Sequence, residues 1–458
     1  MMRCVAVAIA CGAMVAPAAA LDNGLALTPP MGWNPWNCFG VGRTGACKLP
    51  LPWTGGRTAA TGGCHGFNES IIVGIAKVMA EKLKPAGYEY MSLDCGYSTK
   101  QRDAGGDLVV NTTRYPHGMA WLGEQIHGLG LKFGMYAAQG EAQCCSRIDP
   151  NATDGSGPRK GNAAGYYEKD AKLFTSWEVD YLKFDGCSGP KSSILAMNKA
   201  IKQAGRPMVY SINNGISASN ADLTNMWRTT GDVSNTYSSR MNRAAKNNNA
   251  TAVVSGRKGA WNDADMLETG NFFPKSADGK SFDVALGDAE GRTNFALWCL
   301  MKAPLILGVD LTNLTAADLA TVTNKDAIAV SKDPLGEQGL LRVNSQWEQP
   351  AFASRGILRS VPTFGYQVWS GALAGKSVAA VLANMELAKQ TLTLDASALP
   401  PGVAAAAAAA AASKWDIRDA FSSYRCEGCA LPQSVAVGAH DVAMLILTPS
   451  KSTSSTSQ

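Results

Sequence analysis

Short apolar strands alternate with helical segments over about 250 residues of this chain, and this alternation limits its possible folds most strongly. The predicted strands are 31–33, 88–94, 131–136, 181–185, 207–212, 226–232, 259–266 and 303–308. Helical apolar spacing predicts intervening helices at 71–84, 117–130, 162–177, 192–204 and 291–302. Eight such strands predict a (β/α)8 TIM barrel. The alternative, a doubly wound open sheet, usually carries a Gly-rich phosphate loop after its first strand, and none occurs here.

The pattern changes near Gly339, where strand-like runs follow one another without amphipathic helices. These runs are 378–383, 391–394, 415–417 and 442–447. They predict an antiparallel β domain. We therefore place the barrel at 21–337 and the second domain at 338–450. The polyalanine tract 404–412 is expected to be a low-complexity loop insertion, and the Ser/Thr-rich tail 451–458 is expected to be disordered.

The first twenty residues predict export. They comprise one Arg near the start, an apolar core and an Ala-rich end before Leu21, which is typical of a secretory signal peptide. The mature protein is then expected in the secretory pathway, either secreted or lysosomal/vacuolar. The net charge of +5 comes without a long Lys/Arg run, so neither nucleic acid nor a membrane is an expected partner. A homodimer is compatible with the sequence.

Export makes disulfide bonds and N-glycosylation reasonable expectations. Cys426 and Cys429 are close enough to form a short-loop disulfide, whereas a zinc site would need a second ligand pair that does not follow. The pairing of four further cysteines is left open, namely Cys38, Cys47, Cys64 and Cys95. Glycosylation sequons begin at Asn68, Asn111, Asn151, Asn249 and Asn313.

Carboxylates at the ends of predicted strands indicate the chemistry. Residues 181, 183 and 185 share one face of their strand, and Asp185 lies at its carboxyl end, where barrel enzymes place their active sites. Arg228, Thr230 and Asp232 share a face of a later strand. Two carboxylates near aromatic residues suggest glycoside hydrolysis, which uses one as nucleophile or base and the other as acid.

The neighbours of the two carboxylates suggest a division of roles. Lys183 beside Asp185 should keep Asp185 ionised, as a nucleophile requires. Asp232, as the acid, should lie away from cations or in a different balance of neighbours that keeps it protonated. Trp33 and Trp36 could belong to the core or form an apolar platform for a sugar ring.

Other classes of function have weaker support. The chain has four His and no HxxxH or HExxH pair, so a metal site is not expected, and no other cofactor is implied. It has no GxSxG elbow for a serine hydrolase. A sugar-binding barrel without catalytic activity remains an alternative.

Seven ordered motifs resemble glycoside hydrolase family 27, the α-galactosidase (melibiase) and α-N-acetylgalactosaminidase family. They are TPPMGWNPWN at 28–37, GYEYMSLDC at 87–95, GLKFGMY at 130–136, VDYLKFDGC at 179–187, WRTTGD at 227–232, WNDADM at 261–266 and KDPLGEQG at 332–339. WDIRD at 415–419 and GAHDVAML at 438–445 resemble the C-terminal β-sandwich of that family. The resemblance extends from about Leu25 to Thr448.

The resemblance implies a retaining mechanism, with Asp185 as nucleophile and Asp232 as acid/base. The family positions that line the sugar pocket correspond to Trp36, Asp94, Tyr136, Lys183, Cys187, Arg228 and Asp265. Asp265 could instead be structural. Cys144 and Cys187 match a family disulfide beside the nucleophile.

Two departures from the family pattern concern the choice of sugar. The family often has two adjacent Asp after the second strand, where this chain has Asp94 and Cys95. Its fifth strand commonly ends in Cys-Glu-Trp, where this chain has Ile212, Asn213 and Asn214, and that Glu helps to recognise the 2-hydroxyl in α-galactosidases. Asn213 is therefore expected to bind the sugar and set its identity. The expected activity is hydrolysis of terminal α-D-galactosyl residues, and the alternatives are α-N-acetylgalactosaminidase, β-L-arabinopyranosidase or α-glucan activity.

Overall fold

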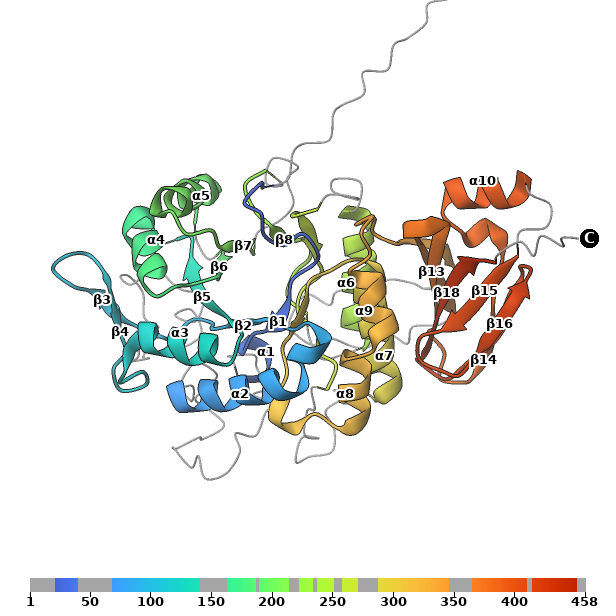
Figure 1. The fold of residues 1–458 in the computed structure, drawn as a ribbon, viewed down its shortest axis with the longest axis horizontal. Coiled ribbons are helices and arrows are strands. Elements are labelled where there is room, and N and C mark those ends of the chain that lie inside the picture. The colour runs from blue at the N-terminus through green and yellow to red at the C-terminus, as the bar shows by residue number, and fades with distance from the viewer. Residues whose placement is uncertain are drawn as a thin grey trace, which may run out of the picture.

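The computed structural model describes residues 21–39, 68–140, 163–186, 189–213, 222–233, 237–250, 258–270, 287–345, 365–409 and 414–450. The predicted signal peptide, the tail 451–458, Cys144 and Cys187 lie outside these ranges, so the expectations about them stay predictions. Figure 1 shows a helix-covered parallel sheet and, to its right, a smaller β domain in orange and red.

Eight parallel strands form the central sheet, in the order β10-β1-β2-β5-β6-β7-β8-β9. They are β1 (Met31–Trp33), β2 (Tyr90–Ser92), β5 (Lys132–Ala138), β6 (Tyr181–Asp185), β7 (Val209–Ile212), β8 (Met226–Arg228), β9 (Trp261–Asp263) and β10 (Leu305–Leu307). Leu267, just after β9, closes the ring because its N–H donates to Ile306 O and its carbonyl accepts from Gly308 N, both at 2.8 Å. The predicted (β/α)8 barrel is confirmed.

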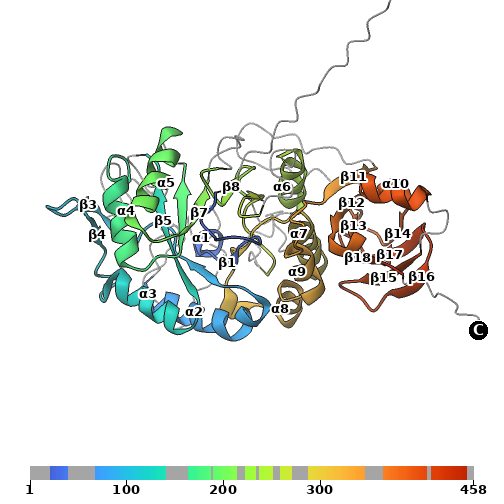
Figure 2. The same ribbon diagram turned by 45° about the horizontal axis from the view of Figure 1, so that its top comes forward.

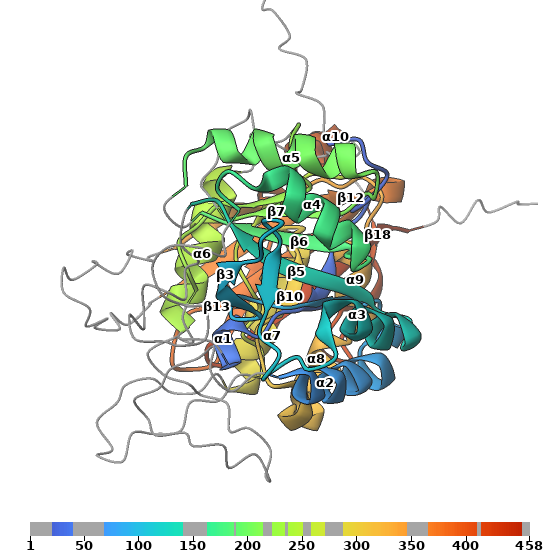
Figure 3. The same ribbon diagram turned by 90° about the vertical axis from the view of Figure 1, so that its left-hand side faces the viewer.

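The helices cover the outside of the barrel, as Figure 3 shows for α3, α4 and α5 around β5, β6 and β7. They are α2 (Glu69–Lys82), α3 (Gly118–Gly128), α4 (Tyr167–Ser176), α5 (Ser192–Ala204), α6 (Tyr237–Ala250), α7 (Asp288–Leu300), α8 (Ala316–Val322) and α9 (Lys325–Ser331). The short α1 (Trp36–Phe39) follows β1, and a hairpin of β3 (Ser98–Arg102) and β4 (Leu108–Val110) projects at the left of Figure 1. α5 ends at Ala204 because the next residue, Gly205, has φ +82°, a left-handed conformation that glycine adopts without steric cost.

Successive side chains of β6 face opposite sides of the sheet, as expected. Leu182 and Phe184 are fully buried in the layer between sheet and helices. Tyr181 packs inside the barrel with inward residues of four other strands, namely Tyr90, Val209, Met226 and Trp261. This apolar layer fills the barrel beneath the carboxyl ends of the strands, so Lys183 and Asp185 lie above it.

The C-terminal domain is an antiparallel β-sandwich. Its main sheet has the order β11-β12-β13-β18-β15-β16, and β14 and β17 pair separately. The strands are β11 (Leu340–Asn344), β12 (Tyr366–Leu373), β13 (Ser377–Asn384), β14 (Gln390–Leu394), β15 (Trp415–Asp419), β16 (Arg425–Cys429), β17 (Gln433–Val437) and β18 (Val442–Pro449). Leu382 of the main sheet and Leu392 and Val437 of the small one share a core, which makes two packed layers.

Two expectations about this domain have different outcomes. The disulfide between Cys426 and Cys429 is present on β16. The loop expected at 404–412 is wrong for 404–409, because α10 spans Pro401–Ala409, and 410–412 lie outside the described residues. Alanine has the highest helix propensity, and proline is favoured at the first helical position, so local preference favours a helix here.

The sandwich packs against the barrel through α7, which Figure 2 shows between the two sets of strands together with α6 and α9. Trp369, Val381 and Met444 on the outer face of the main sheet join the core of the barrel helices. Arg292 of α7 forms an ion pair with Asp441 at 2.7 Å. Tyr237 at the start of α6 stacks on His440, with ring centroids 4.4 Å apart. No helix within the described ranges combines the length and apolar character needed to cross a membrane.

Candidate active site

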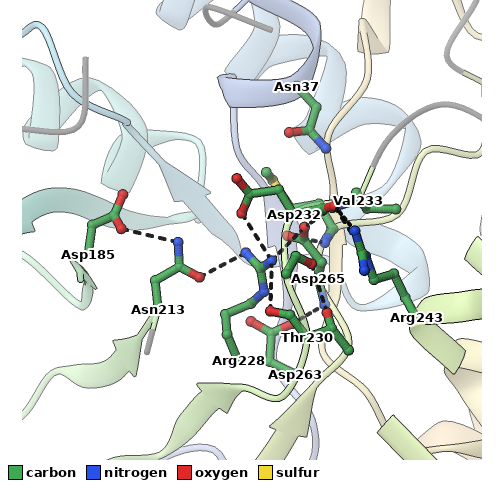
Figure 4. A network of polar contacts seen from close by, with 12 residues as sticks. Asn37, Asp185, Asn213, Arg228, Thr230, Asp232, Val233, Arg243, Asp263 and Asp265 are labelled. Atoms are coloured by element: carbon green, nitrogen blue, oxygen red, sulfur yellow. Dashed lines mark hydrogen bonds and ion pairs between the residues drawn. The ribbon is translucent and has the colours of Figure 1, made fainter. Parts of the chain in front are cut away.

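The polar residues predicted from the sequence meet at the carboxyl ends of the barrel strands. Asp185 is the last residue of β6 and Arg228 is the last residue of β8. Asn213 follows β7, Asp94 follows β2, and Asp265 follows β9. Parallel strands bring all these ends to one face of a barrel. Figure 4 shows Asp185, Asn213 and Arg228 in a row, with Asp232 and Asp265 around the guanidinium.

Asp185 is buried, and two side chains donate hydrogen bonds to its carboxylate. Tyr136 Oη donates to Oδ2 and Asn213 Nδ2 donates to Oδ1, each at 3.2 Å. Burial raises the pKa of Asp185, the charge of Lys183 lowers it, and the charge of Asp94 raises it, so that the pKa lies above its ordinary value. Lys183 thus acts in the expected direction, but burial outweighs it.

Lys183 makes its direct ion pair with Asp94 and not with Asp185. The Nζ–Oδ2 distance is 2.6 Å, and Asn34 Nδ2 donates to the same oxygen at 3.1 Å. Lys183 Nζ also lies 5.7 Å from the ring centroids of both Trp36 and Tyr136. These contacts fix the ammonium near the site, where it can donate to substrate hydroxyls.

The two tryptophans near β1 have different environments. Trp33 is fully buried, and its Nε1 donates to Val309 O at 2.7 Å, so it belongs to the core. Trp36 is only partly buried and faces Lys183. Trp36 is therefore the one available as a platform for a sugar ring.

Arg228 joins the residues from β7, β8 and β9. Its Nη1 donates to Asn213 Oδ1 at 2.8 Å, and its Nη2 lies 2.8 Å from Asp265 Oδ2 and 3.2 Å from Asp232 Oδ1. Asp232 does not lie away from cations, which was the first arrangement expected for the acid. Its side chain is 83% exposed, so the carboxyl is accessible to a substrate.

Asp265 connects Arg228 to the loop that carries Asp232. Its Oδ2 accepts from Val233 N at 2.5 Å, and its Oδ1 accepts from Met266 N at 2.8 Å. Asp265 is buried and has φ +88°, which is uncommon for a residue other than glycine. Strain of this kind persists where surrounding contacts impose it.

A small cavity of about 30 Å³ lies among these side chains, which is enough room for a water molecule. Lys183, Asn213, Arg228 and Asp265 line it, together with Asp263 at the end of β9. Burial raises the pKa of Asp263 to about 6, although Arg228 lowers it. Asp263 was not predicted, although the 261–266 motif contains two Asp and only the second was chosen.

Replacing Asp263 with Asn should stabilise the protein above the pKa of this group. The folded-state pKa of about 6 exceeds the ordinary 3.8. The buried carboxyl group therefore contributes most favourably to the free energy of unfolding below pH 4, and this contribution is lost as the pH rises through 6. Asp263→Asn keeps the acceptor for Asp265 N. Relative to the wild type, its free energy of unfolding should rise by about 2–3 kcal/mol between pH 4 and pH 7.

Chemical denaturation of the wild type and Asp263→Asn at both pH values measures this difference. Asp22→Asn is the control because Asp22 is exposed, and it should show no such change. An equal stability difference between the wild type and Asp263→Asn at pH 4 and pH 7 would contradict the raised pKa.

Contacts in the structure connect nine of the predicted site residues: Trp36, Asp94, Tyr136, Lys183, Asp185, Asn213, Arg228, Asp232 and Asp265. Cys187 lies outside the described residues. Asn34, Asp263 and Arg243 contribute contacts that were not predicted. Among the described residues, no group of three or more His, Cys, Asp and Glu is arranged to bind a metal ion.

Comparison with known proteins identifies the family. A family model described as Alpha galactosidase A matches residues 28–333, and one described as Alpha galactosidase C-terminal beta sandwich domain matches 363–447. The chain belongs to the α-galactosidase family. Its members are glycoside hydrolases, and this protein is one of them.

Relatives in the family are similar along most of their length. The alpha-galactosidase of Coffea arabica is 33% identical over 440 residues, covering 94% of this chain and 96% of the relative. Alpha-galactosidase A of Homo sapiens is 33% identical over 355 residues, or 73% of each chain. The crystal structure of alpha-galactosidase I from Mortierella vinacea superposes with a TM-score of 0.72 at 26% identity, covering 94% of this chain and 99% of the other.

Proposed function

We propose that this protein hydrolyses terminal α-D-galactosyl residues of oligosaccharides or glycoconjugates by double displacement, and that it acts after export. The observation that carries the proposal is the arrangement of Asp185 and Asp232. Asp185 is buried between two hydrogen-bond donors at the end of β6, and Asp232 is exposed beside Arg228 at the end of β8. No cofactor is required, because two carboxyl groups and water suffice for the reaction.

In the first step, a carboxylate oxygen of Asp185 forms a bond to the anomeric carbon as the glycosidic bond breaks. Asp232 gives its proton to the departing oxygen. In the second step, Asp232 takes a proton from water, whose oxygen attacks the anomeric carbon and releases Asp185. Each step inverts the anomeric carbon, so the product has the configuration of the substrate.

A panel of nitrophenyl glycosides tests the substrate. The α-galactoside should have the highest kcat/KM when compared with the α-N-acetylgalactosaminide, the β-L-arabinopyranoside and the α-glucoside. A higher kcat/KM for another member of the panel would mean that its sugar, and not galactose, is preferred. If the protein turns over no member of the panel but still binds galactose, the proposed hydrolase activity is contradicted.

Asn213 favours a second candidate, a related hydrolase with a different group at the sugar 2-position. Asn213 is neutral, whereas a Glu would offer an ionic acceptor to a 2-hydroxyl. Its amide also donates to Asp185 and its oxygen accepts from Arg228, so it connects recognition of the sugar to the nucleophile.

Replacing Asn213 with Glu should raise the preference for the α-galactoside over the α-N-acetylgalactosaminide about tenfold or more, since a charged hydrogen bond contributes about 1.5–3 kcal/mol. A second carboxylate would also raise the pKa of Asp185, so absolute rates at acidic pH should fall. The ratio of kcat/KM on the two substrates separates these effects, because both substrates use the same nucleophile.

Asn213→Gln is the matched control, because Gln has the length of Glu without its charge. It should leave the ratio near that of the wild type. If Asn213→Glu also leaves the ratio unchanged, Asn213 does not recognise the 2-position, and specificity must lie elsewhere, first at Asp94 and Cys95.

A further inference from the structure

The loop that carries Asp232 depends on its backbone for its position. The Asp232 side chain is 83% exposed, so packing does not fix the carboxyl. Its direct side-chain contact within the described residues is with Arg228 at 3.2 Å. The direction of an exposed side chain follows from the main chain to which it is attached. The contacts of the main chain at 231–233 are therefore decisive.

Two buried side chains bind that main chain from opposite sides. Arg243 donates to the carbonyl oxygen of Asp232 through Nε at 3.1 Å and also through Nη2. Asp265 accepts the N–H of Val233 at 2.5 Å. The peptide group between Asp232 and Val233 thus has its oxygen and its N–H bound by charged partners, and such bonds are stronger than neutral ones.

Arg243 reaches the loop from α6 (Tyr237–Ala250), whose described part packs against α7 and β9. Arg243 is only 9% exposed. Its two terminal guanidinium nitrogens lie 3.8 Å from the position that a Cβ on Gly231 would occupy. Figure 4 shows Arg243 on the side of the loop away from Asp185. Arg243 can therefore touch the loop without touching a sugar bound at Asp185.

We propose that Arg243 is a positioning residue for Asp232, acting through the main-chain carbonyl so that the carboxyl of Asp232 reaches the glycosidic oxygen. This proposal rests on the proposed function, in which Asp232 is the acid/base. It assigns no contact with substrate to Arg243. Its consequence is that loss of Arg243 should resemble a partial loss of the acid.

The dependence on leaving group distinguishes a misplaced acid from general damage. An alkyl α-galactoside needs a proton on its departing oxygen, whereas a dinitrophenolate departs without one. Comparing kcat/KM for methyl α-galactoside and 2,4-dinitrophenyl α-galactoside isolates proton donation, because both values report the step in which the glycosidic bond breaks. Structural damage unrelated to Asp232 would lower both values equally.

Arg243→Met removes the donors and keeps an unbranched side chain. It should lower kcat/KM for the methyl galactoside by up to about 10²-fold, the scale of a misplacement of about 1 Å, and leave the dinitrophenyl galactoside near the wild-type value. Arg243→Lys restores one donating nitrogen and should show a smaller loss with the same selectivity. If Arg243→Met does not fold, Arg243→Lys carries the same test.

Arg206→Met is the matched control. Arg206 Nε also donates to a main-chain carbonyl, that of Val179, but at the amino ends of the barrel strands. It should leave the ratio of the two kcat/KM values unchanged. Equal losses on both substrates in the Arg243 variants, or no loss on either, would overturn the proposal.

Asp232→Ala separates this failure from failure of the proposed function. If Asp232→Ala selectively loses kcat/KM for the methyl galactoside and the Arg243 variants do not, only the role of Arg243 is wrong. If Asp232→Ala shows no selectivity either, Asp232 is not the acid, and both proposals fail.

Discussion

Asp185→Gly is expected to lower kcat on the α-galactoside by about 10⁶-fold, the scale for removing a covalent nucleophile. The strand β6 should remain, because Asp185 is its last residue and the buried Leu182 and Phe184, which pack the strand against the helices, are unchanged. Added azide should restore turnover of a substrate with a good leaving group, because it can occupy the space of the missing carboxylate. The product of this rescue should be the β-galactosyl azide, since only one displacement occurs.

Asp185→Asn is the control for a general effect of azide. It fills the space of the carboxylate without its charge, so it should be inactive and gain little from azide. Turnover of Asp185→Gly near the wild-type rate without azide would remove Asp185 from the mechanism.

Asp232→Ala is expected to lower kcat/KM on alkyl galactosides by about 10²–10⁴-fold, the usual contribution of a general acid. The dinitrophenyl galactoside should still react with Asp185, but kcat should fall because water lacks its general base in the second step. Azide needs no base, so it should restore kcat and yield the α-galactosyl azide. The two rescue products have opposite anomeric configuration, which NMR distinguishes directly.

Thr230→Ala is a useful comparison for Asp232→Ala. Thr230 lies in the same loop, and its hydroxyl donates to Gly231 O and Ala264 O. This variant tests whether loss of loop contacts alone reproduces the effect. A β-galactosyl azide from Asp232→Ala, or equal losses on both leaving groups, would contradict the assignment of Asp232 as the acid/base.

Some elements could be predicted because residues close together in the sequence determine them. The strand 181–185 and the helix 192–204 were predicted at the bounds that the structure shows. Strict alternation determines the first, and apolar spacing before Gly205 determines the second. α6 was not predicted, because its polar sequence YSSRMNRAAKNNNA has few apolar positions to mark a helical face.

The sequence predicted residues that the structure brings together, but it predicted fewer of the contacts between them. Asp185, Arg228 and Lys183 could be placed because each lies at or near the end of a recognisable strand. The partner of Lys183 could not, since Asp94 comes from a strand 89 residues away, and only the closed barrel brings the two together. Arg243 was missed for the same reason, because its role depends on how α6 packs beside the loop at 231–233.

The central claim is that Asp185 forms a covalent bond to the sugar. A fluorinated α-galactosyl fluoride tests it most directly, because ring fluorine slows breakdown of the intermediate while fluoride remains a good leaving group. Intact-protein mass spectrometry and peptide mapping should show one fluorogalactosyl group, attached to Asp185, together with loss of activity in proportion to labelling. A label on another residue would contradict the account, as would first-formed β-galactose from an α-galactoside.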